Sequence, residues 1–258
     1  MTSLPIGRAA ISGASSGIGA AYADRLARRG FDLLLIARRA DRLECLARTL
    51  VEAYGVDVQT FAADLENPAS LAAAAARVRE PDVSILINTA GAAGPDPTAE
   101  VTAGQIERMF RLNVVALSRL SHAALANFRA DGRGLLVNIG SVAHSASPNT
   151  AAYSGSRAYV LNFTHSLRAE HATHPGVQIQ LVLTGPSGPE LFSSDRADFT
   201  PEQLVDAALA GAEAGELVTF PAMADPALWE RLEGAQVTTP TARGAGTKRR
   251  PRSEPMTA

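Results

Sequence analysis

Tyr153 and Arg157 are four residues apart in the segment AAYSGSRAY, residues 151–159. On a helix this spacing places two side chains on one face, one turn apart. A cation close to a phenol favours its ionised form, so such a pair is suited to proton transfer. Ser141, ten residues before this segment, offers a second hydroxyl that could hold a substrate oxygen. These side chains are candidates for chemistry at a carbonyl or alcohol group.

A glycine-rich turn near the start of the chain points to a nucleotide. The segment ISGASSGIGAAYADRLARRG, residues 11–30, follows a short apolar run and opens a helical pattern. Gly13, Gly17 and Gly19 give the pattern G-x-x-x-G-x-G. Glycines also occur in ordinary tight turns. Between a strand and a helix, however, such a turn directs backbone N–H groups at a helix N-terminus, where a pyrophosphate binds favourably.

Two arginines at the end of the second apolar run indicate which nucleotide is bound. Dinucleotide-binding α/β folds that bind NAD usually carry an acidic residue at the end of this second strand, where it holds the ribose 2′-hydroxyl. This chain has Ala37 followed by Arg38 and Arg39. Guanidinium groups suit a 2′-phosphate, and the start of a helix disfavours cations that have no anionic partner. The pair therefore favours NADP(H) over NAD(H).

The elements that must position these residues alternate between strands and helices. We expect strands at 9–12, 32–37, 56–63, 83–88, 134–140, 177–183 and 216–220, and helices near 18–29, 40–54, 68–79, 103–129, 152–172 and 201–213. Several strands are apolar throughout, as in a parallel sheet covered on both faces. The alternation predicts an α/β fold with a doubly wound parallel sheet of about seven strands. We expect one domain over 1–236 and a disordered tail over 237–258, which is rich in Gly, Pro, Thr and charge.

Composition narrows the class of protein. The 258 residues carry a formal net charge of -2, which gives no general attraction for nucleic acid or an anionic membrane. A single cysteine, Cys45, allows no internal disulfide and suits the cytoplasm. No signal peptide and no apolar run long enough to span a bilayer is apparent. His165, His171 and His174 lack a cysteine or a clear carboxylate partner, so we expect no metal site.

Six segments in order resemble the short-chain dehydrogenase/reductase family over about residues 5–220. They are SGASSGIG (12–19), ADLEN (63–67), NTAG (88–91), RLNVVA (111–116), NIGSVA (138–143) and YSGSR (153–157). The resemblance implies a single Rossmann-type domain, a nicotinamide cofactor and a small-molecule carbonyl or alcohol substrate. It also implies a homodimer or homotetramer built on the long helices.

The same resemblance implies a role for individual residues. Tyr153 would be the acid/base and Ser141 the donor to the substrate oxygen. Arg157 would be the electrostatic helper, and Asn113 would support a proton-relay water. Together with the glycine turn and the arginine pair, the expected cofactor contacts are Gly13, Ser15, Ser16, Gly17, Ile18, Gly19, Arg38, Arg39, Asp64, Leu65, Asn88, Ala90, Gly91, Tyr153, Arg157 and Gly185.

The chain departs from the family pattern on the nicotinamide side of the cofactor. Arg157 stands where the family has lysine; it keeps the charge but effectively never releases a proton. Thr89 replaces the usual second asparagine. In VLTGPSGPE (182–190) the family has Pro-Gly followed by an apolar residue and a threonine, and here only Gly185 clearly matches. Pro189, at the threonine position, offers neither a hydroxyl nor a backbone N–H.

These departures leave three functions open. The first is an NADP-dependent oxidoreductase that uses Tyr153 as its acid/base. The second is a non-redox enzyme on the same scaffold, in which Tyr153 and Ser141 transfer protons for dehydration, epimerisation or cyclisation. The third is a catalytically impaired protein that binds NADP or a partner. Turnover of NADPH distinguishes the first, and tight NADPH binding without turnover distinguishes the third.

Overall fold

The computed structural model of the chain describes residues 4–92, 100–141, 151–184 and 200–221. The chain divides into two compact units, residues 1–222 and 223–258. The second unit lies wholly outside the described residues, and so does the predicted tail at 237–258. The boundary predicted at residue 236 therefore stays a prediction.

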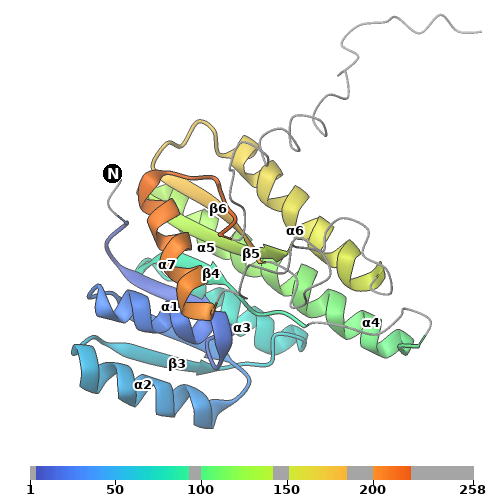
Figure 1. The fold of residues 1–258 in the computed structure, drawn as a ribbon, viewed down its shortest axis with the longest axis horizontal. Coiled ribbons are helices and arrows are strands. Elements are labelled where there is room, and N and C mark those ends of the chain that lie inside the picture. Colours follow the sequence, from blue (N-terminus) through green and yellow to red (C-terminus); the bar gives the residue numbers. More distant parts are fainter. Residues whose placement is uncertain (1–3, 93–99, 142–150, 185–199, 222–258) are drawn as a thin grey trace, which may run out of the picture. The chain divides into compact units, whose positions relative to one another are not determined.

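The first unit is built on one parallel sheet of seven strands, in the order β3-β2-β1-β4-β5-β6-β7 (Figure 1). The strands are β1 (Arg8–Ser12), β2 (Asp32–Ala37), β3 (Val58–Ala62), β4 (Val83–Asn88), β5 (Gly134–Ser141), β6 (Val177–Thr184) and β7 (Val218–Thr219). The chain runs outward from β1 to β3 and then returns to the other side of β1 at β4. The order therefore reverses between β1 and β4, the place where doubly wound sheets bind ligands at their carboxyl ends. The predicted fold class is confirmed.

Helices cover both faces of the sheet. They are α1 (Gly17–Arg28), α2 (Ala40–Tyr54), α3 (Pro68–Val78), α4 (Ala103–Phe110), η1 (Arg111–Ala116), α5 (Leu117–Asp131), α6 (Ala151–Glu170) and α7 (Pro201–Ala214). Alternate strand residues enter two apolar cores. Ile11 and Leu35 pack with α1, α2 and α7, whereas Ala10 and Leu34 pack with α3 and α5. Both faces are buried, which explains why several strands are apolar throughout.

One predicted helix proves to be three segments. The apolar pattern predicted a single helix over 103–129, but a π-helix, η1, separates α4 from α5. A π turn holds one more residue than an α turn, and such turns are common at functional sites. The periodicity of apolar residues does not reveal this local widening. Asn113 lies within η1, where it is fully buried and bonds the Ser156 hydroxyl.

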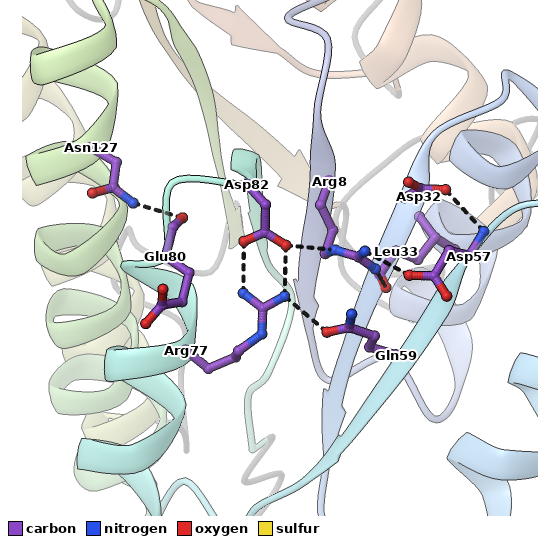
Figure 2. A network of polar contacts seen from close by, with 9 residues as sticks. All are labelled: Arg8, Asp32, Leu33, Asp57, Gln59, Arg77, Glu80, Asp82 and Asn127. Atoms are coloured by element: carbon purple, nitrogen blue, oxygen red, sulfur yellow. Dashed lines mark hydrogen bonds and ion pairs between the residues drawn. The ribbon is translucent and has the colours of Figure 1, made fainter.

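A network of ion pairs ties the amino ends of the central strands together (Figure 2). Arg8 on β1 donates to Asp57 at 2.6 Å, to Asp82 at 2.8 Å and to the Leu33 carbonyl at 2.9 Å. Arg77 on α3 donates twice to the Asp82 carboxylate, at 2.8 and 2.9 Å. Its guanidinium, with Arg8, holds the pKa of Asp82 below the usual value. Every cation of this network is thus satisfied by carboxylates of the same protein.

Candidate nucleotide and catalytic site

The glycine turn between β1 and α1 is closed so tightly that it leaves no room for side chains. A Cβ on Gly19 would lie 2.4 Å from the Gly13 carbonyl oxygen, and a Cβ on Gly13 would lie 2.8 Å from the Ala90 nitrogen. Gly13 and Gly17 also have positive φ angles of 75° and 53°, which favour glycine. The turn therefore presses the start of α1 against the end of β4, at the position where the strand order reverses.

A cleft of about 370 Å³ opens at this carboxyl edge of the sheet. Its wall contains many of the residues that were predicted to contact a cofactor: Gly13, Ser15, Ser16, Ile18, Gly19, Arg38, Arg39, Asp64, Leu65, Ala90 and Gly91. The sequence did not assign five further lining residues: Ala37, Ala63, Glu66, Thr89 and Leu112. Four of these residues are next in sequence to an assigned residue at the carboxyl end of a strand. That proximity could have predicted them from the sequence. Leu112 comes from η1, whose place was not predicted.

The two arginines of the cleft face different partners. Arg39 donates to the Ser15 hydroxyl at 2.8 Å and to the Ser16 hydroxyl at 3.0 Å. Its guanidinium therefore lies against the glycine turn. Arg38 lies 3.5 Å from the Glu66 carboxylate instead. The positive charge of Arg39 meets only hydroxyls among the described residues, and so it is available to an anion that enters the cleft.

Asn88 has its side chain inside the sheet. It is 3% exposed and donates at 3.0 Å to both the Ser121 hydroxyl and the Asn138 side-chain oxygen. Asn138 in turn donates to the Thr164 hydroxyl at 3.0 Å. The Ser12 hydroxyl is 3.4 Å from the Asn88 oxygen. These buried amides join β1, β4 and β5 to helices α5 and α6, so Asn88 holds the sheet to the helices that cover it. The predicted contact of Asn88 with the cofactor stays a prediction.

Asn113 joins η1 to the start of α6. Its oxygen accepts from the Ala92 nitrogen at 2.8 Å, and its amide donates to the Ala92 carbonyl at 3.0 Å and to the Ser156 hydroxyl at 3.1 Å. Ser156 donates to the Tyr153 carbonyl at 2.7 Å. The Asn113 side chain thus holds the chain that follows β4 and, through Ser156, the backbone of Tyr153.

Arg157 connects the candidate acid to the cleft. Its guanidinium carbon lies 4.9 Å from the centre of the Tyr153 ring, a cation–π contact. Its Nη1 is 3.5 Å from the Ile139 carbonyl on β5, and its buried Nε has no partner among the described residues. Its Nη2 lies 2.7 Å from the point that a Cβ on Gly91 would occupy. The arginine therefore extends from α6 to the Gly91 wall of the cleft, and only a glycine leaves room for it.

Ser141 is the last residue of β5 and is 4% exposed. It lies opposite Thr184, the last residue of β6. The segment 142–150, between Ser141 and α6, lies outside the described residues, and so does Gly185 with the rest of the atypical segment up to 190. The predicted roles of Ser141 and Gly185 therefore stay predictions.

The described residues contain neither a cluster of metal-binding side chains nor a helix suited to a membrane. No group of three or more His, Cys, Asp or Glu side chains in that part of the chain could hold a metal ion. No helix there has both the length and the apolar character needed to cross a membrane.

The doubly wound sheet, the glycine turn and the cleft at the switch point define a dinucleotide-binding α/β protein. The family model described as short chain dehydrogenase matches residues 8–199, so the chain belongs to the short-chain dehydrogenase/reductase family. The predicted resemblance to this family is confirmed.

Two solved structures are similar to this chain over most of its length. A short-chain dehydrogenase from Sphingobium yanoikuyae in complex with NADPH is 39% identical, with a TM-score of 0.84 over 93% of this chain and 99% of that chain. A bulky-bulky ketone specific alcohol dehydrogenase from Comamonas testosteroni is 35% identical, with a TM-score of 0.84 over 93% of this chain and 97% of that chain.

One curated relative, unlike the two dehydrogenases above, is named as inactive. The inactive hydroxysteroid dehydrogenase-like protein 1 of Homo sapiens is 30% identical over 179 residues, which is 68% of this chain and 54% of that protein. The chain spans about half the length of the first curated relatives that it matches.

Proposed function

We propose that this protein is an NADP(H)-dependent oxidoreductase that transfers a hydride between the nicotinamide and a carbonyl or alcohol substrate. The observation that carries the proposal is the position of Arg157. Its guanidinium contacts both the Tyr153 ring and Gly91 on the cleft wall. The candidate acid therefore lies one side chain away from the cleft that would hold the cofactor.

The residues of the cleft fit an NADP(H) molecule. The glycine turn, which has no space for a Cβ, would hold the pyrophosphate at the start of α1. Arg39 would bind the 2′-phosphate, because its guanidinium meets only the Ser15 and Ser16 hydroxyls among the described residues. Asp64 and Leu65 would meet the adenine. When bound, the cofactor would supply or accept the hydride.

The protein's own groups would manage the proton and the substrate oxygen. The Tyr153 hydroxyl would donate a proton to the oxygen on which charge develops, and the Ser141 hydroxyl would hold that oxygen. Arg157 would keep a fixed positive charge beside the ring in every step, because a guanidinium does not release its proton. Asn113 would hold the Tyr153 backbone through Ser156.

The test is NADPH oxidation with a panel of ketones, which should include ketones with two bulky substituents because of the Comamonas relative. We expect turnover by the full chain and a loss of at least about 100-fold in Tyr153→Phe. The matched control is Tyr159→Phe on the same helix, whose hydroxyl bonds Ser118, and it should keep normal turnover. Equal turnover in Tyr153→Phe and the full chain would remove Tyr153 as the acid.

A second candidate function is NADP(H) binding without turnover. It is favoured by the arginine at position 157, whose fork packs against the cleft wall, and by a relative that is named inactive. Tight NADPH binding together with no turnover on the whole panel would support it. An increase in turnover in Arg157→Lys would show that the arginine hinders hydride transfer.

The proposal includes assembly into a cytoplasmic homodimer or homotetramer. Phe110 on α4, Val115 on η1 and Tyr159 on α6 are exposed in the single chain, and apolar surface of this kind supports association. Light scattering on the full chain tests the oligomeric state, and a monomeric mass at micromolar concentration would contradict it.

A further inference from the structure

Glu66 lies in the cleft, and its backbone is fixed by the turn that leads from β3 to α3. The Asp64 carboxylate accepts from the Glu66 nitrogen at 3.0 Å, and the Asn67 nitrogen donates to the Asp64 carbonyl at 3.0 Å. Asn67 then caps α3 by accepting from its first backbone nitrogens. The backbone at Glu66, from which its side chain enters the cleft wall, is therefore held by a hydrogen-bonded turn and a capped helix.

The partner of Glu66 is the less constrained of the two residues. The Arg38 Nη1 lies 3.5 Å from the Glu66 Oε1, and the Arg38 side chain is 65% exposed whereas that of Glu66 is 18% exposed. Arg38 is therefore the member of the pair that is freer to move, whereas the carboxylate of Glu66 is enclosed in the cleft wall. The pairing therefore draws Arg38 toward Glu66.

The neighbouring Arg39 has no such competitor among the described residues. Arg39 donates to the neutral hydroxyls of Ser15 and Ser16, which a phosphate can join without separating an ion pair. Arg38 must first leave Glu66 if it is to bind the same phosphate. A phosphate monoester carries about −1.5 to −2 charges at pH 7, so it is also repelled by the Glu66 carboxylate on the same cleft wall.

From these contacts we infer that Glu66 determines how strongly the cleft distinguishes 2′-phosphorylated from unphosphorylated dinucleotides, because it keeps Arg38 from the phosphate. The inference rests on the proposed function, since it concerns the NADP(H) cleft. It adds to that cleft a carboxylate that weakens its preference, so that Arg39 supplies most of the phosphate recognition. Arg38 is thus paired with a carboxylate, whereas Arg39 is bonded, among the described residues, only to hydroxyls.

The experiment is calorimetric binding of NADPH and of NADH to the full chain and to Glu66→Gln. We expect NADPH to bind roughly three- to fivefold more tightly in the variant, as for the loss of one partly exposed charge pair. NADH should change by less than about twofold, since it lacks the 2′-phosphate. Glu107→Gln is the matched control, because Glu107 on α4 pairs with Arg111 on η1 at 3.6 Å, and neither residue lines the cleft.

A second pair of variants tests the route through Arg38. If Glu66 acts by holding Arg38, then Glu66→Gln should improve NADPH binding by less than about twofold in a chain that already carries Arg38→Gln. An equal gain in both backgrounds would overturn that route. An unchanged ratio of NADPH to NADH affinity in Glu66→Gln would overturn the inference and leave the proposed function standing. A full chain that binds neither dinucleotide would contradict the proposed function itself.

Discussion

The two edges of the sheet use arginine in opposite ways. At the amino edge, Arg8 and Arg77 are paired with Asp57 and Asp82 at distances between 2.6 and 2.9 Å (Figure 2). At the carboxyl edge, Arg39 instead contacts hydroxyls, and Arg157 contacts a ring and a carbonyl. Within the described part of the chain, neither of the latter two is paired with a carboxylate.

This difference separates residues that hold the fold from residues that are available to a ligand. A cation that is paired with carboxylates of its own protein is costly to remove, because its partners are left unpaired, and it has little attraction left for a further anion. A cation held only by neutral groups keeps most of its attraction for a phosphate. Arg38, between Glu66 and the cleft, is intermediate. Substitutions at the two edges should therefore affect different measurements.

The largest effect is expected where the carboxyl edge is most tightly closed. In Gly19→Ala the new methyl group would meet the Gly13 carbonyl, so the turn must open and the backbone groups that face the pyrophosphate must move. We expect NADPH affinity to fall by about 100-fold, the scale of losing one or two hydrogen bonds to a charged group. Calorimetry measures it. Gly155→Ala on α6, where a Cβ would meet nothing within 4 Å, is the control; equal losses in both would contradict the special role of the turn.

Arg39→Gln should produce the next largest effect, and only for one cofactor. The loss of a charged hydrogen-bond donor to the 2′-phosphate should weaken NADPH binding by roughly tenfold and leave NADH within about twofold. Arg42→Gln, on the exposed surface of α2, serves as the control. If NADPH and NADH weakened equally in Arg39→Gln, Arg39 would not be the 2′-phosphate ligand.

Arg8→Gln should show the reverse pattern at the amino edge. The variant loses hydrogen bonds to two carboxylates and a carbonyl, and we expect the free energy of unfolding to fall by about 1–3 kcal/mol. NADPH affinity should stay within about twofold of normal. Urea unfolding and calorimetry on the same preparation provide both values. A tenfold loss of NADPH affinity without a loss of stability would erase the distinction between the edges.

The smallest effect concerns pH. Arg77 first, and then Arg8, hold the pKa of the Asp82 carboxylate below its usual value near 3.8. Because this pKa is lowered in the folded state, the ion pairs stabilise the protein fully above the usual pKa of Asp82. That stabilisation is lost as the pH falls through the lowered pKa of the folded state. Because Asp82 is 43% exposed, we expect less than about 1 kcal/mol. The free energy of unfolding, measured with urea at several values between about pH 5 and pH 3, should fall less steeply with decreasing pH in Asp82→Asn than in the unchanged protein. Equal pH dependence in the two proteins would contradict this.

Local patterns explain how much of the fold could be predicted. The bounds of β4 at 83–88 and α2 at 40–54 agree with the predicted ranges, because runs of apolar residues and a C-terminal glycine mark such elements directly. Strand β7 was predicted over 216–220 and covers only Val218–Thr219. The π-helix was missed because its widened turn leaves no mark in the spacing of apolar residues.

The candidate site was predicted less completely than the fold. Residues that follow the carboxyl ends of strands could be assigned from their order, and they do line the cleft. The partners of individual side chains could not, because they depend on distant parts of the chain. Glu66 meets Arg38 across 28 positions and Asn113 meets Ser156 across 43. Such contacts arise from the register of helices against the sheet, which sequence patterns do not fix.

The most direct test of the proposed function follows the hydride itself. NADPH that carries deuterium at its transferable position is incubated with the full chain and, in turn, with each ketone of the panel, and the product is analysed by mass spectrometry. Hydride transfer predicts one deuterium on the carbinol carbon, formed in step with NADPH oxidation and lost in Tyr153→Phe. Tight NADPH binding with no deuterated product from any ketone of the panel would contradict it.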